Sequence, residues 1–311
     1  AGTKLFFLYS NTEASANKMC ARSATITPGS PPTISLNSDE TVVFSTASPG
    51  YMNQPQLIQA SDGAIWAGRY DRVIADQFNI KRSTCSPSPC ITSWSSFVII
   101  DSVTSKGSVS LAILGSGKVM GIYSEGSTLY ASECTTTPSC GTPINIASIY
   151  NGGDYEPKCI SDGSIGIGCV YLSVTYPYSV YFRKYDGTSW DTALLISNPS
   201  NLSQSSPNIS ITDSRFVIGW LEGGLKQLKL YKSVLSPTQS SDFVSLPGIP
   251  MDGWIKTDMQ MAGDGLTSLI YWQRRFGVNL STYGQPIMFK YYLGNVNPWI
   301  YLEKLWREVN P

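Results

Sequence analysis

A repeat of about 50 residues runs along the sequence and limits the folds that the chain can adopt. Each copy has an alternating strand, a tight turn with Gly or Asp, and a second strand of apolar and aromatic residues. The second strands carry an aromatic residue at Tyr70, Tyr123, Tyr171, Trp220 and Tyr271, which gives steps of 53, 48, 49 and 51 residues. Repeats of this length are typical of propellers and solenoids.

Each copy continues with two further strands, and four strands per repeat are typical of a propeller blade. We expect third strands at 129–134, 179–184 and 286–291, and fourth strands at 142–146, 193–196 and 243–246. With the half-repeat at 5–9, the sequence predicts an all-β chain, a six-bladed β-propeller of four-stranded antiparallel blades, with residues 1–311 as a single domain. A solenoid fits less well, because a β-helix contributes one strand per turn.

The first copy lacks its own first strand. We therefore expect the ring to close by combining N- and C-terminal strands, or by a strand from a neighbouring subunit. The segment 301–309 has helical character and equally suits a closing strand.

The strand and turn pattern resembles that of secreted bacterial β-propeller repeat proteins, over most of residues 50–300. Tyr185-Asp-Gly-Thr-Ser-Trp190 resembles a degenerate Asp-box of the sialidase-like (BNR-type) class, and Ser61-Asp-Gly-Ala-Ile-Trp66 is a looser version at another position. The full S-x-D-x-G-x-x-W pattern is not intact. The resemblance implies a propeller fold and leaves the activity open, since propellers host many functions.

The composition excludes several kinds of chemistry. The chain has no histidine, which removes Ser-His-Asp, Cys-His and His-zinc mechanisms. Its 22 basic and 22 acidic residues give no net charge, which argues against a nucleic-acid partner. No apolar run reaches the 18 or so residues that a transmembrane helix needs. The start of the sequence has no basic-then-apolar leader, as expected of a mature secreted chain.

Six of the seven cysteines fall in local pairs. The spacing predicts disulfides Cys85–Cys90, Cys134–Cys140 and Cys159–Cys169, with Cys20 left over as an inert buried thiol or as a link to another chain. A metal site is the weaker interpretation, because the spacings are not those of zinc sites. Disulfides indicate an oxidising compartment, so we expect an extracellular or cell-surface protein.

Three triplets fit the glycosylation pattern, at Asn201, Asn208 and Asn279. They agree with an outside location and with a glycoprotein. We predict no cofactor and no metal, although Ca²⁺ is conceivable at Asn151-Gly-Gly-Asp154, which more often forms a plain turn.

Residues near the ends of the second strands are the candidate ligand-binding set. In a propeller these positions converge around one mouth of the central channel. The set is Arg69, Tyr70, Asp71, Arg72, Tyr123, Glu125, Tyr171, Trp220, Glu222, Trp272, Arg274 and Arg275. The aromatic residues also suit packing between blades, and the charged ones also suit solvated loops. Arg forks bind carboxylates, and aromatic faces stack on sugars, so an acidic glycan is a coherent ligand.

These features predict a non-catalytic extracellular propeller that acts in adhesion or as a subunit of a surface assembly or filament, with itself or other surface proteins as partners. A glycan-binding lectin is the alternative. The third hypothesis is a sialidase-like glycoside hydrolase or a lyase. It would use a Tyr beside Glu125 or Glu222 as a nucleophile and carboxylate pair. We assign no catalytic residue.

Overall fold

Strands make up nearly all of the secondary structure. The computed structural model describes residues 3–13, 16–28, 33–46, 52–71, 77–102, 109–150, 157–161, 164, 166–197, 204–223, 227–249, 260–263, 267–274, 285–292 and 300–301. Within these ranges there is no α-helix, and two short 3-10 turns occur, η1 (Gly115–Gly117) and η3 (Ser240–Asp242). The chain divides into two compact units, Ala1–Ile146 and Ala147–Pro311.

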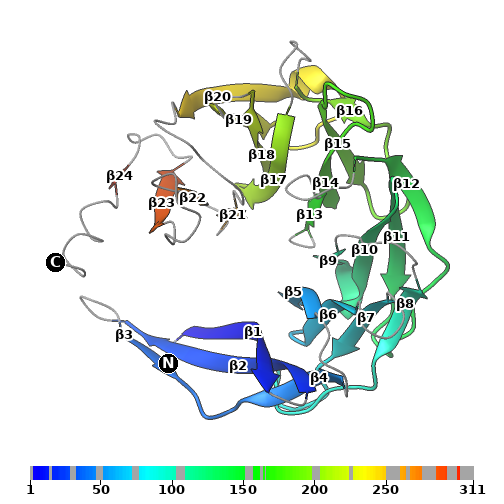
Figure 1. The fold of residues 1–311 in the computed structure, drawn as a ribbon, viewed down its shortest axis with the longest axis vertical. Helices are drawn as coiled ribbons and strands as arrows, with labels where there is room; N and C mark the ends of the chain where they lie inside the picture. Colours follow the sequence, from blue (N-terminus) through cyan, green and yellow to red (C-terminus); the bar gives the residue numbers. More distant parts are fainter. Residues whose placement is uncertain are drawn as a thin grey trace. The chain divides into compact units, whose positions relative to one another are not determined.

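The first unit contains three four-stranded antiparallel sheets in its described residues (Figure 1). The N-terminal sheet consists of β1 (Thr3–Glu13), β2 (Ala16–Thr27), β3 (Thr33–Leu36) and β4 (Thr41–Thr46). The second sheet consists of β5 (Met52–Gln59), β6 (Ile65–Asp71), β7 (Gln77–Arg82) and β8 (Val98–Ser102). The third sheet consists of β9 (Val109–Ile113), β10 (Val119–Glu125), β11 (Thr128–Cys134) and β12 (Ile144–Ser148).

The second unit has the same plan in its described residues. The fourth sheet consists of β13 (Lys158–Ile160), β14 (Ile167–Leu172), β15 (Val180–Tyr185) and β16 (Leu194–Leu195). The fifth consists of β17 (Gln204–Thr212), β18 (Arg215–Glu222), β19 (Gln227–Ser233) and β20 (Phe243–Ile249). The sixth consists of β21 (Gln260–Gly263), β22 (Thr267–Arg274), β23 (Gln285–Tyr292) and β24 (Ile300–Tyr301). The third and fourth strands predicted from the repeat agree with these bounds to within three residues.

The second strands β6, β10, β14 and β18 are almost fully buried, and in β6 each face packs against a different sheet of the first unit. In β6, Ile65 and Ala67 belong to the core shared with the N-terminal sheet, whereas Trp66 and Tyr70 belong to the core shared with the third sheet. This follows from the period of two along a strand. In the second unit, β18 packs against the fourth sheet through Phe216, Ile218 and Trp220. Continuous apolar second strands in the sequence therefore indicate burial on both faces.

Glycines in the second strands make room for aromatic rings. A Cβ at Gly168 in β14 would lie 2.5 Å from the Phe216 ring and 2.8 Å from the Phe182 ring. Gly68 in β6 is similarly covered by Phe78 and Leu111, each at 3.1 Å from the Cβ position. The close approach of these rings is possible only because glycine has no side chain.

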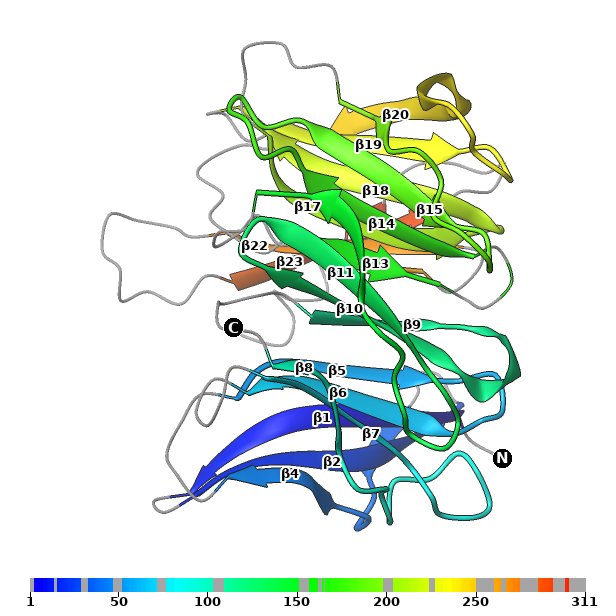
Figure 2. The same cartoon turned by 90° about the vertical axis from the view of Figure 1, so that its right-hand side faces the viewer.

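The N-terminal sheet differs from the others in its pairing. Both β3 and β4 pair with β2, at opposite ends of that strand, and β1 pairs with β2 along its whole length. Figure 2 shows β1 and β2 side by side as long blue strands. Among the described residues, β1 has a strand partner on one edge only.

The structure confirms all three predicted disulfides, Cys85–Cys90, Cys134–Cys140 and Cys159–Cys169. The first two close loops between third and fourth strands, and the third joins directly opposed residues of β13 and β14. Cys20 is buried and takes part in none of these three disulfides. Three disulfides indicate that the protein folds in an oxidising compartment. In the described part of the chain, no helix has the length and hydropathy required to cross a membrane.

We expect Gly168→Ala to lower the free energy of unfolding by about 1–3 kcal/mol, because the added methyl group overlaps two aromatic rings in a packed core. Urea denaturation followed by tryptophan fluorescence measures the change. Gly115→Ala is the matched control, since nothing lies within 4 Å of its Cβ position. Equal stability of the two variants would contradict the role assigned to Gly168.

Candidate functional site

The candidate residues do lie near the ends of second strands. Arg69, Tyr70 and Asp71 are in β6, Tyr123 and Glu125 in β10, Tyr171 in β14, Trp220 and Glu222 in β18, and Trp272 and Arg274 in β22. Arg72 and Arg275 fall outside the described residues, and the side chains of Asp71, Trp272 and Arg274 are likewise not described. A common mouth for the whole set remains a prediction.

The described aromatic members of the set are packing residues. Tyr70 and Tyr123 belong to the core between the second and third sheets, and Trp220 belongs to the core between the fourth and fifth. Tyr171 is 4% exposed and stacks on Tyr181, and burial raises its pKa to about 12. Their rings are therefore not available to stack on a sugar.

Arg69 is also buried, at 6% exposure. Its guanidinium lies over the ring of Phe44, 4.6 Å from the centroid, and the Lys81 ammonium lies 5.5 Å from the same centroid. Burial, and then the positive charge of Arg69, lower the pKa of Lys81. The arrangement is a cation–π contact that joins β6 and β7 to β4. In this position Arg69 stabilises the contact between the N-terminal and second sheets.

Glu222 takes part in a polar network at the end of the fifth sheet. Its carboxylate is 3.1 Å from the Lys229 ammonium and accepts a hydrogen bond from the side chain of Gln204 at 3.3 Å. The backbone N–H of Gln204 donates to the carbonyl of Tyr178 in the fourth sheet, at 3.3 Å. The network thus connects Glu222 with the loop between β14 and β15.

That loop carries an exposed aromatic group that the sequence set did not include. Tyr176 is 68% exposed and meets the ring of Tyr178 edge-on, with centroids 5.6 Å apart. The Tyr178 ring in turn packs on Tyr150 at 4.1 Å. A Tyr-Pro-Tyr run in a loop between second and third strands was the available sequence signal; the contact with Tyr150, some 28 positions earlier, was not visible.

A second exposed feature is the outer face of the N-terminal sheet. Phe6 and Leu8 pack toward the second sheet, so Leu5, Phe7 and Tyr9 lie on the opposite face. The strand register places further residues of β2, β3 and β4 on the same side of the sheet: the buried Cys20 and Ala24, together with Arg22, Ile26, Ile34, Leu36 and Val42. Four of its apolar side chains are strongly exposed: Phe7 at 40%, Ile34 at 64%, Leu36 at 61% and Val42 at 47%.

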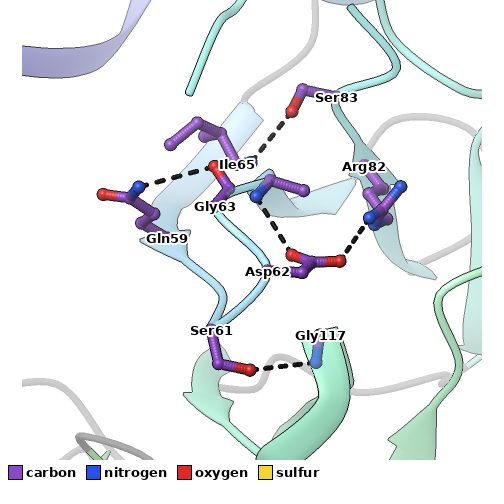
Figure 3. A network of polar contacts seen from close by, with 9 residues as sticks. Gln59, Ser61, Asp62, Gly63, Ile65, Arg82, Ser83 and Gly117 are labelled. Carbon is purple, nitrogen blue, oxygen red and sulfur yellow. Dashed lines mark hydrogen bonds and ion pairs between the residues drawn. The ribbon is translucent and has the colours of Figure 1, made fainter. Parts of the chain in front are cut away.

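The turn that contains the looser Asp-box-like run is structural (Figure 3). Asp62 accepts a hydrogen bond from the backbone of Ala64 at 3.0 Å and forms an ion pair with Arg82. The Ser61 hydroxyl accepts a hydrogen bond from the backbone of Gly117 at 3.0 Å. These contacts fix the β5–β6 turn and tie the second sheet to the third.

The other Asp-box-like run closes the β15–β16 turn. The Asp186 carboxylate accepts hydrogen bonds from the backbone of Thr188 and Ser189, each at 2.8 Å, and the Trp190 ring packs on Tyr185. These backbone hydrogen bonds lower the pKa of Asp186 to about 2. In the fifth sheet, Asp242 accepts backbone hydrogen bonds from Thr238 and Gln239 in the same way.

Two further predictions can be placed. Asn208 is 4% exposed, and its side-chain oxygen accepts hydrogen bonds from the backbone of Ile209 and Met261, so this fold leaves no room for a glycan there. Asn201, Asn279 and the proposed Ca²⁺ turn at 151–154 lie outside the described residues. Within the ranges that the structure describes, no group of three or more Cys, Asp or Glu side chains is placed to hold a metal ion.

No protein-family model matches the sequence, and no curated protein matches it either. Solved structures do match. A lectin from Aleuria aurantia in complex with alpha-methyl-L-fucoside matches with a TM-score of 0.54 and 11% identity, over 96% of this chain and 93% of that one. The fold is β-propeller-like.

Two carbohydrate-acting enzymes of known structure share this fold. An ulvan lyase of polysaccharide lyase family PL25, bound to a -[GlcA(1-4)Rha3S]- saccharide, has a TM-score of 0.52 and 8% identity, over 90% of this chain and 79% of that one. An oligogalacturonate lyase in complex with manganese has a TM-score of 0.50 and 10% identity, over 97% and 85%. At such identities the likeness concerns the fold alone.

We expect Arg69→Ala to lower the free energy of unfolding by about 1–3 kcal/mol, because it removes both the aliphatic stem and the cation–π contact with Phe44. Arg69→Met, which keeps the stem, should lose less. A double-mutant cycle with Phe44→Leu, followed by urea denaturation, should show coupling between the two positions. Wild-type stability of Arg69→Ala would contradict this role and return the residue to the ligand-binding set.

The Asp186 turn should depend on pH. Because its pKa is depressed in the folded protein, the carboxylate stabilises the turn above its ordinary pKa near 3.9, and this stabilisation is lost as the pH falls toward about 2. NMR titration of the Asp186 carboxyl carbon and of the Ser189 amide should show one shared transition near pH 2. A midpoint near 4 would be inconsistent with the capped geometry.

Proposed function

We propose that this protein is a non-catalytic extracellular β-propeller that acts in adhesion or as a subunit of a cell-surface assembly or filament. Its three disulfides support an extracellular location. Asn201 and Asn279 remain proposed glycan acceptors. We extend the fold assignment to six blades in one domain, on the strength of the repeat in the sequence.

The observation that carries the proposal is the state of β1. Each of β10, β14 and β18 has a strand on both edges, and nearly all of their residues are buried. The central segment of β1, from Leu5 to Tyr9, is just as apolar, yet its residues are half-buried or exposed, and β1 has a described partner on one edge only. An exposed apolar edge strand is a template for pairing with another chain.

The repeat order suggests which strand fills this position. In every described sheet after the N-terminal one, the first strand follows the fourth strand of the preceding sheet. Residues 302–311 follow β24 in the sequence, and by the repeat order we propose this segment as the source of a first strand. Pairing of this segment with β1 combines N- and C-terminal strands, which closes a ring within one chain or links two copies. For the assembly we propose the second arrangement.

Such a link is heterologous: the C-terminal segment of one copy meets the N-terminal sheet of the next. Head-to-tail contacts of this kind form rings if the rotation closes and filaments if it does not. The apolar outer face of the N-terminal sheet would be covered in the same contact, and this removes from water the residues Phe7, Ile34, Leu36 and Val42.

We expect the purified protein to form oligomers or polymers that Phe7→Lys dissociates, since the lysine places a charge in the centre of the outer face. Light scattering and negative-stain electron microscopy provide the measurement. Phe97→Lys is the matched control, because Phe97 is 56% exposed and precedes β8 in another sheet. Thermal melts establish that both variants fold.

A second variant, which ends at Tyr301, tests whether residues 302–311 supply the strand that pairs with β1. It should be monomeric and should bind a synthetic peptide of residues 302–311. A strictly monomeric wild-type protein would refute assembly and favour closure within one chain, and unchanged assembly of Phe7→Lys would show that the contact lies elsewhere.

A further inference from the structure

The loop that joins β14 and β15, residues 173–179, presents an aromatic tip to solvent. Tyr176 is 68% exposed and Val174 is 52% exposed. By contrast, Tyr171 on β14 and Phe182 on β15 are buried. Two exposed apolar side chains on one short loop make the loop a candidate binding surface.

Hydrogen bonds hold this loop in one shape. The backbone N–H of Ser173 donates to the carbonyl of Ser179 at 2.9 Å, and the N–H of Ser179 donates back to the Ser173 hydroxyl at 2.9 Å. The same hydroxyl donates to the carbonyl of Thr175 at 3.1 Å. A loop closed in this way loses little conformational entropy on binding a ligand.

The exposed ring is supported from below by two others. Tyr178 packs on Tyr150 with centroids 4.1 Å apart, and both rest on the core between the fourth and fifth sheets. Tyr176 stands on Tyr178 at an interplanar angle of 89°. The orientation of the Tyr176 ring is therefore set by packing, while most of its surface stays in water.

The loop itself carries no charged side chain. Residues 172–180 contain no Asp, Glu, Lys or Arg. Gln204, which is tethered to Tyr178 through its backbone, binds Glu222, and the charge of Glu222 is balanced by Lys229 at 3.1 Å. An acidic glycan needs an unpaired positive charge at its binding site, and these contacts provide none. A neutral glycan does not need such a charge.

We propose that the 173–179 loop binds a neutral sugar residue of a glycan, stacked on Tyr176. The C–H face of a pyranose ring is apolar and matches one aromatic face, and its hydroxyls can pair with tyrosine O–H groups and loop backbone. Size favours a sugar over a protein, because stable protein interfaces bury about 1,200–2,000 Å², far more than one tyrosine and one valine supply. This site goes beyond the assembly function and lies in the other compact unit from Phe7.

The test is binding to a printed array of neutral and acidic glycans, followed by calorimetric titration of the neutral glycans bound. Wild type should bind neutral glycans. Tyr176→Ala should weaken binding about tenfold or more, and Tyr176→Phe, which keeps the ring, should stay within about threefold. Leu235→Ala is the control, since Leu235 is also exposed, at 56%, in the same unit but outside the loop. The Phe7→Lys variant should bind sugar as wild type does.

Three results of the array and the titration would overturn the proposal. They are the absence of binding to any glycan on the array, a preference for acidic glycans, and wild-type affinity of Tyr176→Ala. A further arm uses a glycoprotein-coated surface before and after periodate oxidation of its sugars. Loss of binding supports a sugar ligand, and retention identifies a protein ligand and refutes the proposal.

Discussion

Burial of both faces of the second strand is the constraint on which the rest of this structure depends. A sheet whose middle strand is apolar on both faces is stable only when a neighbouring sheet covers each face. Glycines such as Gly68 and Gly168 let aromatic rings approach these strands closely. Within each compact unit, sheets therefore pack against one another, and the side chains between two sheets are committed to packing. Residues that are free to bind something are found in loops or on a sheet that lacks a covering neighbour.

This constraint explains why much of the candidate set consists of core residues. A residue at the end of a second strand suits two different roles. It can line the mouth of the predicted central channel, or it can pack between two sheets. The repeat in the sequence predicts these positions and cannot separate the two roles, because both favour Tyr and Trp. In the structure Tyr70, Tyr123 and Trp220 pack between sheets, and Arg69 lies over Phe44. A buried arginine on an aromatic face has no sequence signature, since Phe44 is 25 positions away on another sheet.

Features set by local chemistry were predictable from the sequence. The alternation and turn residues located the strands, and the short Cys loops located the disulfides, because loop closure over five to ten residues needs no knowledge of the rest of the fold. Features set by long-range contacts were not predictable. The support of Tyr178 by Tyr150 and the burial of Asn208 beside Met261 both depend on segments that meet only in the folded chain. The exposed outer face of the N-terminal sheet belongs to the same class, because Phe7, Leu36 and Val42 come together through strand register.

The two proposed surfaces, the β1 edge with its outer face and the 173–179 loop, together explain adhesion better than either one alone. One sugar ring stacked on one tyrosine is a weak ligand, and affinity at a single site of this size is limited by the small area that it buries. Adhesion by such a site requires many copies that bind the same surface at once, since linked sites bind with a high effective concentration. A head-to-tail assembly through the N-terminal sheet supplies those copies at fixed spacing. The 173–179 loop belongs to neither the β1 edge nor the outer face, so the proposed assembly contact does not use it. Weak binding of a sugar at each subunit would then be sufficient for attachment of the whole assembly. Each single contact would still dissociate readily.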